Sequence, residues 1–178
     1  MNQPLQQLIQ ALLDRKQTVS LAESCTGGQL SALITENPGV SAIFKGSIVS
    51  YANEAKVELL GVGHDSLQRM GAVSEIVARQ MAQGVCHRFH TDWGVSITGV
   101  AGPSGGSQEK PVGTVWMAVA GPKLESSPTN KLETHNDLAE IKEVKKYLFD
   151  GDRKQIQSQS VNAAVSLLLT AIRASASK

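Results

Sequence analysis

Cysteine and long apolar runs are scarce in this chain, and each scarcity excludes a class of protein. Only Cys25 and Cys86 occur among the 178 residues. They are too few for a disulfide framework, so we expect a reduced, cytoplasmic protein. No apolar run approaches the roughly 18 residues that suggest a membrane-spanning helix. The start, Met1-Asn2-Gln3-Pro4, has neither the basic nor the apolar segment of a secretory signal. We therefore expect no membrane partner.

The chain also lacks an excess of charge of either sign. The formal net charge is +1, from 17 Lys and Arg against 16 Asp and Glu, and the two signs are interspersed. Without a basic stripe, we expect no nucleic-acid partner. Net charge does not describe a pocket, so a few residues could still bind a small anion. A chain of this length is expected to form one domain over residues 1–178 and to bury roughly 70% of its unfolded surface.

Helical and extended patterns alternate along the chain. Apolar spacing predicts helices over about 5–13, 27–36 and 54–60, a longer helix after Ser74 and a last helix after Asp152. Asn53, Ser74 and Asp152 are the expected N-caps of the last three helices. Apolar runs predict strands over about 18–22, 44–51, 93–98 and 112–120. This alternation predicts a single-domain, three-layer α/β/α sandwich around a mostly parallel mixed sheet.

The polar stretch over residues 121–143 constrains the fold least. Leu138 and Ile141 could belong to a short helix there. The following segment, 144–149, is either the end of that helix or an edge strand, and the strand is favoured. The apolar first helix, 5–13, could mediate a homodimer, which we expect.

The segment 22–28 reads Ala-Glu-Ser-Cys-Thr-Gly-Gly and follows a predicted strand. A strand end that opens a helix gathers side chains and free backbone N–H groups at one point, which suits a nucleophile and an anion beside it. Ser24 is the leading candidate, although serines at such corners are also common N-caps. Cys25 is a rival nucleophile, because a thiol at a helix start can be acidic.

Ligands of such sheets bind beyond the carboxyl ends of the strands. This rule brings three loops to one edge of the sheet, at residues 23–28, 51–56 and 98–106. These loops carry most of the residues by which the chain resembles the CinA C-terminal-domain family, whose characterised enzymes are nicotinamide-nucleotide amidohydrolases. The matching segments span nearly the whole chain in order, at residues 22–28, 51–56, 71–74, 96–103, 105–106, 110–115 and 151–153.

Two features distinguish the chain within that resemblance. Longer family members carry a separate N-terminal domain, for which this chain has no room, so it resembles the stand-alone amidohydrolases. The stretch over about 123–142 is longer than typical, and we expect it to be either an oligomer contact or a flap over the pocket.

The resemblance implies that Ser24 is the nucleophile, that Lys56 activates it and that Tyr51 orients or relays. A serine hydroxyl needs a neighbouring base, and a lysine can serve only if its pKa falls from about 10.4 toward neutrality. Lys56 lies in the first turn of a predicted helix, where the helix dipole disfavours a cation, and burial would lower its pKa further. The alternative interpretation is an ordinary surface lysine.

The resemblance also implies a set of substrate-binding residues. Backbone amides in the 26–28 turn are plausible oxyanion donors. The guanidinium of Arg153, at the start of a helix, would bind the 5′-phosphate of a mononucleotide. Glu23 could orient Lys56 or a substrate hydroxyl. The full expected set is Glu23, Thr26, Gly27, Gly28, Thr98, Gly99, Gly102, Ser104 and Arg153.

Two other patterns are rejected. Tyr51-x4-Lys56 differs by one residue from the Tyr-x3-Lys pair of short-chain dehydrogenases, and no G-x-G-x-x-G opens the first helix. Cys86, His87 and His90 lack a further ligand at a spacing that would complete a metal site. We therefore expect no metal and no cofactor.

The predicted reaction converts nicotinamide mononucleotide and water into nicotinate mononucleotide and ammonia, a step of pyridine-nucleotide recycling. The partner is then a small mononucleotide. Two alternatives stay open. One is a nucleotide-binding module that has lost catalysis and acts through protein partners, and the other is an amidase for a different amide.

Overall fold

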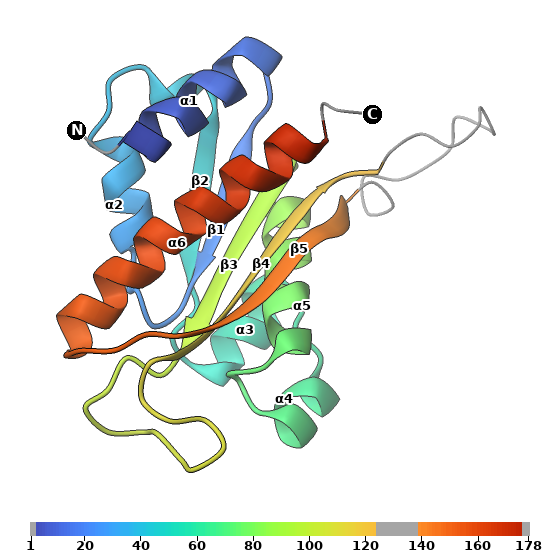
Figure 1. Ribbon diagram of the computed structural model, residues 1–178. Coiled ribbons are helices and arrows are strands. Elements are labelled where there is room, and N and C mark those ends of the chain that lie inside the picture. The colour runs from blue at the N-terminus through green and yellow to red at the C-terminus, as the bar shows by residue number, and fades with distance from the viewer. Residues whose placement is uncertain (1–2, 124–138, 176–178) are drawn as a thin grey trace.

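Five strands form one sheet in the order β2-β1-β3-β4-β5 in the computed structural model, which describes residues 3–123 and 139–175 (Figure 1). Their bounds are Val19–Glu23 for β1, Phe44–Val49 for β2, Trp93–Gly99 for β3, Thr114–Pro122 for β4 and Ala139–Leu148 for β5. β2, β1 and β3 are parallel, and β4 is antiparallel to both of its neighbours. Among the described strands β4 alone therefore opposes the others, as a mostly parallel mixed sheet requires.

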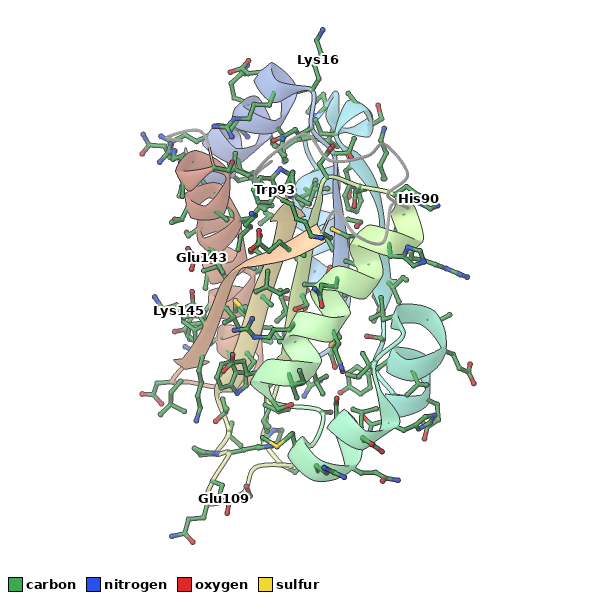
Figure 2. The ribbon with its side chains drawn as sticks, turned by 90° about the vertical axis from the view of Figure 1, so that its right-hand side faces the viewer. Lys16, His90, Trp93, Glu109, Glu143 and Lys145 are labelled. Atoms are coloured by element: carbon green, nitrogen blue, oxygen red, sulfur yellow. The ribbon has the colours of Figure 1, made fainter. Side chains whose placement is uncertain are left out.

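Helices cover both faces of the sheet and complete the expected three layers. α1, α2 and α6 lie on one face, and α3, α4 and α5 lie on the other (Figures 1 and 2). None of the helices in the described part of the chain is long and apolar enough to cross a membrane. Their bounds are Gln3–Arg15 for α1, Gln29–Thr35 for α2, Asn53–Leu60 for α3, His64–Met70 for α4, Glu75–Phe89 for α5 and Arg153–Ala174 for α6, with a 3₁₀ turn at Val40–Ala42.

Small side chains let α5 approach the sheet closely. An added Cβ at Gly94, in β3, would lie 2.3 Å from a backbone oxygen of α5. The hydroxyls of Ser20 and Ser96 donate to the carbonyls of Val85 and Ala78 in α5, at 3.1 and 2.6 Å. These bonds satisfy buried polar groups that would otherwise destabilise the core. They also fix β1 and β3 side by side under one helix, so the loops after the two strands have a defined separation.

The apolar face of α1 packs inward. Leu5, Leu8, Ile9 and Leu12 are buried in the core that α1 shares with α6, whereas Leu13 is exposed. Burying side chains of this size contributes about 1.5–3 kcal/mol each. The apolar face that this helix could offer to a homodimer is therefore already covered within the chain. The homodimer itself stays a prediction.

Helix starts agree with the sequence in part. Asp152 caps α6 in a capping box with Gln155, as expected. Asn53 is not an N-cap, because α3 begins at this residue and Ala52 stands before it without a side-chain bond. Ser74 occupies the N-cap position of α5, but its hydroxyl donates to a carbonyl of the preceding turn.

Two elements differ from the sequence-based expectation. α4 was not predicted, and none of its residues is buried, so it has no apolar stripe to reveal it. β5 extends back to Ala139 and takes in Ile141, so the short helix expected around Ile141 is wrong. Leu138 and most of the long polar stretch, 124–138, lie outside the described residues. The expectation of a flap or an oligomer contact there therefore stays a prediction.

Candidate active site

The loops after β1, β2 and β3 gather at one end of the sheet, beside the start of α6 (lower end in Figure 1). Ser24 follows β1 directly, and Lys56 lies in α3. The Lys56 Nζ is 3.2 Å from the Ser24 Oγ, and the two residues are only 1% and 8% exposed. The structure therefore brings the expected nucleophile and the expected base together at hydrogen-bond distance.

Two backbone carbonyls hold the Lys56 amine. Nζ donates to the carbonyls of Ser50, at 2.6 Å, and Tyr51, at 3.4 Å. Burial lowers the pKa of Lys56, because a buried ammonium loses its hydration. A neutral amine has two protons and one lone pair. With both protons directed at carbonyls, its lone pair is available to accept the Ser24 hydroxyl proton.

Cys25 lies beside this pair but is a poor nucleophile. Burial raises the pKa of its thiol to about 11, so at neutral pH it stays protonated. The thiolate is the reactive form of cysteine. The structure therefore favours Ser24 over Cys25. An uncharged thiol also places no anion beside Lys56 to retain its proton.

A tight turn sets the direction of Ser24. Its backbone N–H donates to Ile97 in β3, at 3.0 Å, and its carbonyl accepts from Gly27 N–H, at 3.1 Å. The N-cap of α2 is Gly28 rather than Ser24. The interpretation of Ser24 as a helix cap is therefore wrong, and its hydroxyl has no capping role that competes with chemistry.

Glu23 is the residue that satisfies the start of α2. The side chain is fully buried, in a cluster of donors from the turn and the helix. Its carboxylate accepts from the hydroxyls of Thr26 and Ser31 and from the backbone amides of Gly28, Leu30 and Ser31, at 2.6–3.1 Å. The anion at this helix N-terminus is thus the protein's own.

This arrangement corrects two expectations. Glu23 does not orient Lys56, because both carboxylate oxygens are taken up by the turn and α2. Gly28 N–H donates to Glu23, and Gly27 N–H donates to Ser24, so neither glycine amide is available as an oxyanion donor. Within residues 3–123 and 139–175, the backbone N–H of Thr26 makes no hydrogen bond, which leaves it as a donor for a ligand.

Arg153 joins two of the loops at this end of the sheet. It is the first residue of α6, and its guanidinium donates to the Gly102 carbonyl, at 2.8 Å, and to the Tyr51 hydroxyl, at 3.1 Å. The Tyr51 side chain is 63% exposed. Tyr51 therefore contacts Lys56 through its backbone carbonyl and Arg153 through its hydroxyl.

Other expected binding residues have structural roles. The Thr98 hydroxyl is buried and donates to the Ala72 carbonyl, at 2.9 Å, which ties β3 to the turn before α5. A Cβ at Gly99 would lie 2.7 Å from the Val115 side chain, so glycine is needed there for strand packing. Ser104 is exposed on the loop, and no hydrogen bond within the described residues links it to the site.

Two residues of the site were missed by sequence reasoning. Ser50 supplies the carbonyl nearest the amine, and its own hydroxyl is buried without a partner among the described residues. Gln157, on α6, donates to the Cys25 carbonyl at 2.8 Å. Gln157 lies four residues after Arg153, on the same side of the helix, and this spacing is the signal that could have identified it.

The residues considered as metal ligands lie elsewhere. Figure 2 shows His90 in the upper half of the molecule and Glu109, in the loop over residues 100–113 that follows β3, at the lower end. Burial raises the pKa of Cys86 to about 12. Among the residues that the structure describes, no three His, Cys, Asp or Glu side chains are grouped to hold a metal ion.

The family model for the CinA C-terminal domain matches residues 2–172. A CinA-like protein of Prochlorococcus marinus (strain MIT 9215) is 45% identical over 161 residues, which are 90% of this chain and 35% of that protein. One from Fervidobacterium nodosum is 43% identical over 88% of this chain and 34% of its own length. The chain therefore spans about a third of these curated relatives.

Solved structures of CinA-related proteins also match this chain, and their chains are close to it in length. The competence/damage inducible protein CihA from Agrobacterium tumefaciens superposes with a TM-score of 0.84, at 33% identity, over 96% of this chain and 94% of that chain. A CinA superfamily protein from Escherichia coli superposes with a TM-score of 0.80, at 31% identity, over 93% of this chain and 87% of that chain.

Proposed function

The chain belongs to the CinA C-terminal-domain family, and from this premise we propose that it is an amidohydrolase acting on nicotinamide mononucleotide. The observation that carries the proposal is the buried Lys56 amine, 3.2 Å from the Ser24 hydroxyl. A lysine of lowered pKa and an adjacent serine form a base and nucleophile pair for acyl transfer. The products are nicotinate mononucleotide and ammonia.

In the acylation half, the Ser24 Oγ attacks the carboxamide carbon, and Lys56 takes the hydroxyl proton. The carbonyl oxygen becomes an oxyanion, for which Thr26 N–H is the available donor of the expected set. The C–N bond then breaks, and Lys56 returns the proton to the departing ammonia. An ester between the nicotinoyl group and Ser24 remains.

In the second half, water attacks the ester carbon and gives a proton to Lys56. The ester C–O bond breaks, the Ser24 oxygen regains that proton, and the acid leaves as nicotinate mononucleotide. The Ser50 and Tyr51 carbonyls keep the amine in place through both halves. The lysine ends neutral, so the cycle needs no external base.

Arg153 supports a phosphorylated substrate. Its guanidinium is oriented by two neutral acceptors, the Gly102 carbonyl and the Tyr51 hydroxyl, so neither partner competes with a phosphate as an anion. A phosphate beside it would gain charge-assisted hydrogen bonds. We propose that the 5′-phosphate lies at Arg153 while the carboxamide lies at Ser24.

The test is ammonia release from nicotinamide mononucleotide by the wild type, Ser24→Ala and Cys25→Ala. We expect Ser24→Ala to abolish release and Cys25→Ala to retain it. Equal rates for the wild type and Ser24→Ala would remove the mechanism. Calorimetric binding of the mononucleotide without turnover would indicate a binding module. Faster turnover of nicotinamide lacking the ribose phosphate would indicate an amidase of another specificity.

A further inference from the structure

Gln157 connects α6 to the turn that carries Ser24. Its amide nitrogen donates to the Cys25 carbonyl at 2.8 Å, and its amide oxygen accepts from Gln29 at 2.9 Å. The side chain is half-buried, one helical turn after Arg153. Because Gln29 fixes the amide from the other side, the nitrogen rather than the oxygen of Gln157 faces the turn.

The Cys25 carbonyl belongs to the same peptide unit as the Thr26 N–H. A peptide is planar, and in its trans form the carbonyl and the N–H point in opposite directions. A donor that holds the carbonyl therefore sets the direction of the N–H. This N–H makes no hydrogen bond in the parts of the chain that the structure describes, although Gly27 and Gly28 in the same turn both donate.

We propose that Gln157 is a positioning residue, which holds the Cys25–Thr26 peptide so that its N–H faces the oxyanion formed when Ser24 attacks. The inference rests on the proposed function, because it assigns a role within that reaction. Hydrogen bonds in series also strengthen one another, by about 10–30% each in condensed phases. The Gln157 bond thus makes the Thr26 N–H a stronger donor as well as a better directed one.

A purely structural role would give different results. If Gln157 only tied α6 to α2, its loss would lower stability and disturb substrate binding and chemistry alike. A donor that acts on the oxyanion stabilises charge that develops only in the transition state. Its loss lowers kcat and leaves KM unchanged.

The variants are chosen to separate the effect of the hydrogen-bond donor on Gln157 from the effect of the size and shape of its side chain. Gln157→Leu removes the donor, and Gln157→Glu replaces it with an acceptor that repels the Cys25 carbonyl. Gln157→Lys keeps a donor on a side chain of similar reach. Gln159→Ala is the matched control, because Gln159 lies on the same helix and donates instead to Asp150 and Gln155.

Two measurements are made on each variant. The first is kcat and KM for nicotinamide mononucleotide. The second is the rate at which a fluorophosphonate labels Ser24, followed by intact mass. In labelling, a bond forms between the Ser24 oxygen and phosphorus, fluoride leaves, and Lys56 takes the proton. The product oxygen on phosphorus occupies the oxyanion position, so this rate reports the donor without depending on the substrate.

We expect kcat and the labelling rate to fall roughly tenfold or more in Gln157→Leu and further in Gln157→Glu, with KM within about twofold of the wild type. Loss of an entire oxyanion donor costs about 10²–10³-fold, and here the donor is displaced rather than removed. Gln157→Lys should retain most of both rates, and Gln159→Ala should match the wild type.

The outcomes distinguish this inference from the proposed function. If the wild type hydrolyses the mononucleotide through Ser24 but Gln157→Leu keeps its kcat and labelling rate, the positioning role is overturned and the function stands. If labelling depends on Gln157 while no mononucleotide is hydrolysed, the substrate is wrong and the positioning role stands. If Gln157→Leu loses stability and all its rates in parallel, or the wild type resists labelling, the positioning role is overturned.

Discussion

The amine of Lys56 lies 3.2 Å from the hydroxyl of Ser24, in a part of the molecule where the lysine is only 1% exposed. Among the described residues no carboxylate forms an ion pair with this amine. A buried charge without a counter-ion is strongly disfavoured, so burial lowers the pKa of this amine and favours its neutral form. The burial that destabilises the ammonium therefore also favours the form of the amine that the proposed base role requires.

The pH dependence of activity should follow Lys56. Burial lowers the pKa of this amine, and the protonated form has no lone pair to accept the Ser24 proton. The rate is thus lost as pH falls through the lowered pKa and rises toward a plateau above it. We expect log kcat/KM to rise with a slope of one on the acidic side. A rate that is constant across this limb would contradict the assignment of Lys56 as the base.

Lys56→Met should reduce activity about 10²–10⁴-fold, as expected for loss of a general base, yet stabilise the fold. The unfolded chain binds a proton at this lysine up to its ordinary pKa of 10.5, and the folded chain releases it at lower pH. The unfolded state therefore binds more protons between the lowered and the ordinary pKa, and stability rises with pH there.

Lys56→Met removes this dependence. Its gain in unfolding free energy over the wild type should be largest at neutral pH or below and should shrink as pH approaches 10.5. Urea unfolding at several pH values measures this difference in unfolding free energy between the variant and the wild type. Lys45→Met, at an exposed lysine, is the control and should show no comparable gain. A constant gap across the range would mean that Lys56 titrates normally.

Arg153→Ala should raise KM for the mononucleotide with a smaller effect on kcat. A hydrogen bond to a charged group contributes about 1.5–3 kcal/mol, which corresponds to roughly a ten- to hundredfold change in KM. Nicotinamide riboside, which lacks the phosphate, should be hydrolysed equally by the wild type and the variant. Tyr51→Phe removes one of the two neutral partners of Arg153 and leaves the Gly102 carbonyl in place, so it should change KM by only a few-fold. A loss that is equal for both substrates would assign Arg153 to loop packing alone.

The pairing of Ser24 with Lys56 could be predicted, because both lie where strand ends meet and both match a known family. The spacing of Gln157 from Arg153 could place it on the same side of α6, but its partner could not be predicted, because that partner is a backbone carbonyl 132 residues away. Side-chain identity does not show which carbonyl lacks a donor. The same holds for Gly27 and Gly28, whose amides are already used within the turn.

The fold was predictable where burial is periodic. α1 and α5 bury one face each, and β1 is buried along its whole length. α4 buries no residue and was missed, whereas the strand favoured over 144–149 is confirmed and only the extension of the partly buried β5 back to Ala139 was missed. In both cases tertiary contacts, rather than local pattern, decide the structure.

Glu23→Gln should destabilise the protein even though it preserves the shape of the side chain. The carboxylate accepts from two hydroxyls and three backbone amides, and an amide NH₂ placed among these donors cannot accept. We expect a loss of about 1–3 kcal/mol in urea unfolding. Glu36→Gln, at the exposed end of α2, should stay within about 0.5 kcal/mol of the wild type. Equal midpoints for the two variants would mean that Glu23 does not hold the turn.

Gly94→Ala tests the close approach of α5 to the sheet. The added Cβ would lie 2.3 Å from the Ala82 carbonyl oxygen and 2.7 Å from the Cys86 sulfur, and the first of these belongs to a helix backbone that cannot rotate away. Overpacking a core costs about 1–3 kcal/mol, occasionally more, and we expect the upper part of this range. Activity should fall as well, because a displaced α5 pulls on the turn that Thr98 anchors.

The control for this substitution is Gly63→Ala. Gly63 has a φ of −67°, and its added Cβ would meet only side-chain atoms, at 3.4 Å or more, so we expect a change of less than about 0.5 kcal/mol. Thermal unfolding and ammonia release are measured on both variants. If Gly94→Ala matches Gly63→Ala in both measurements, α5 does not pack against β3 at this distance. The strand ends that carry Ser24 and Thr98 would then need another explanation for their spacing.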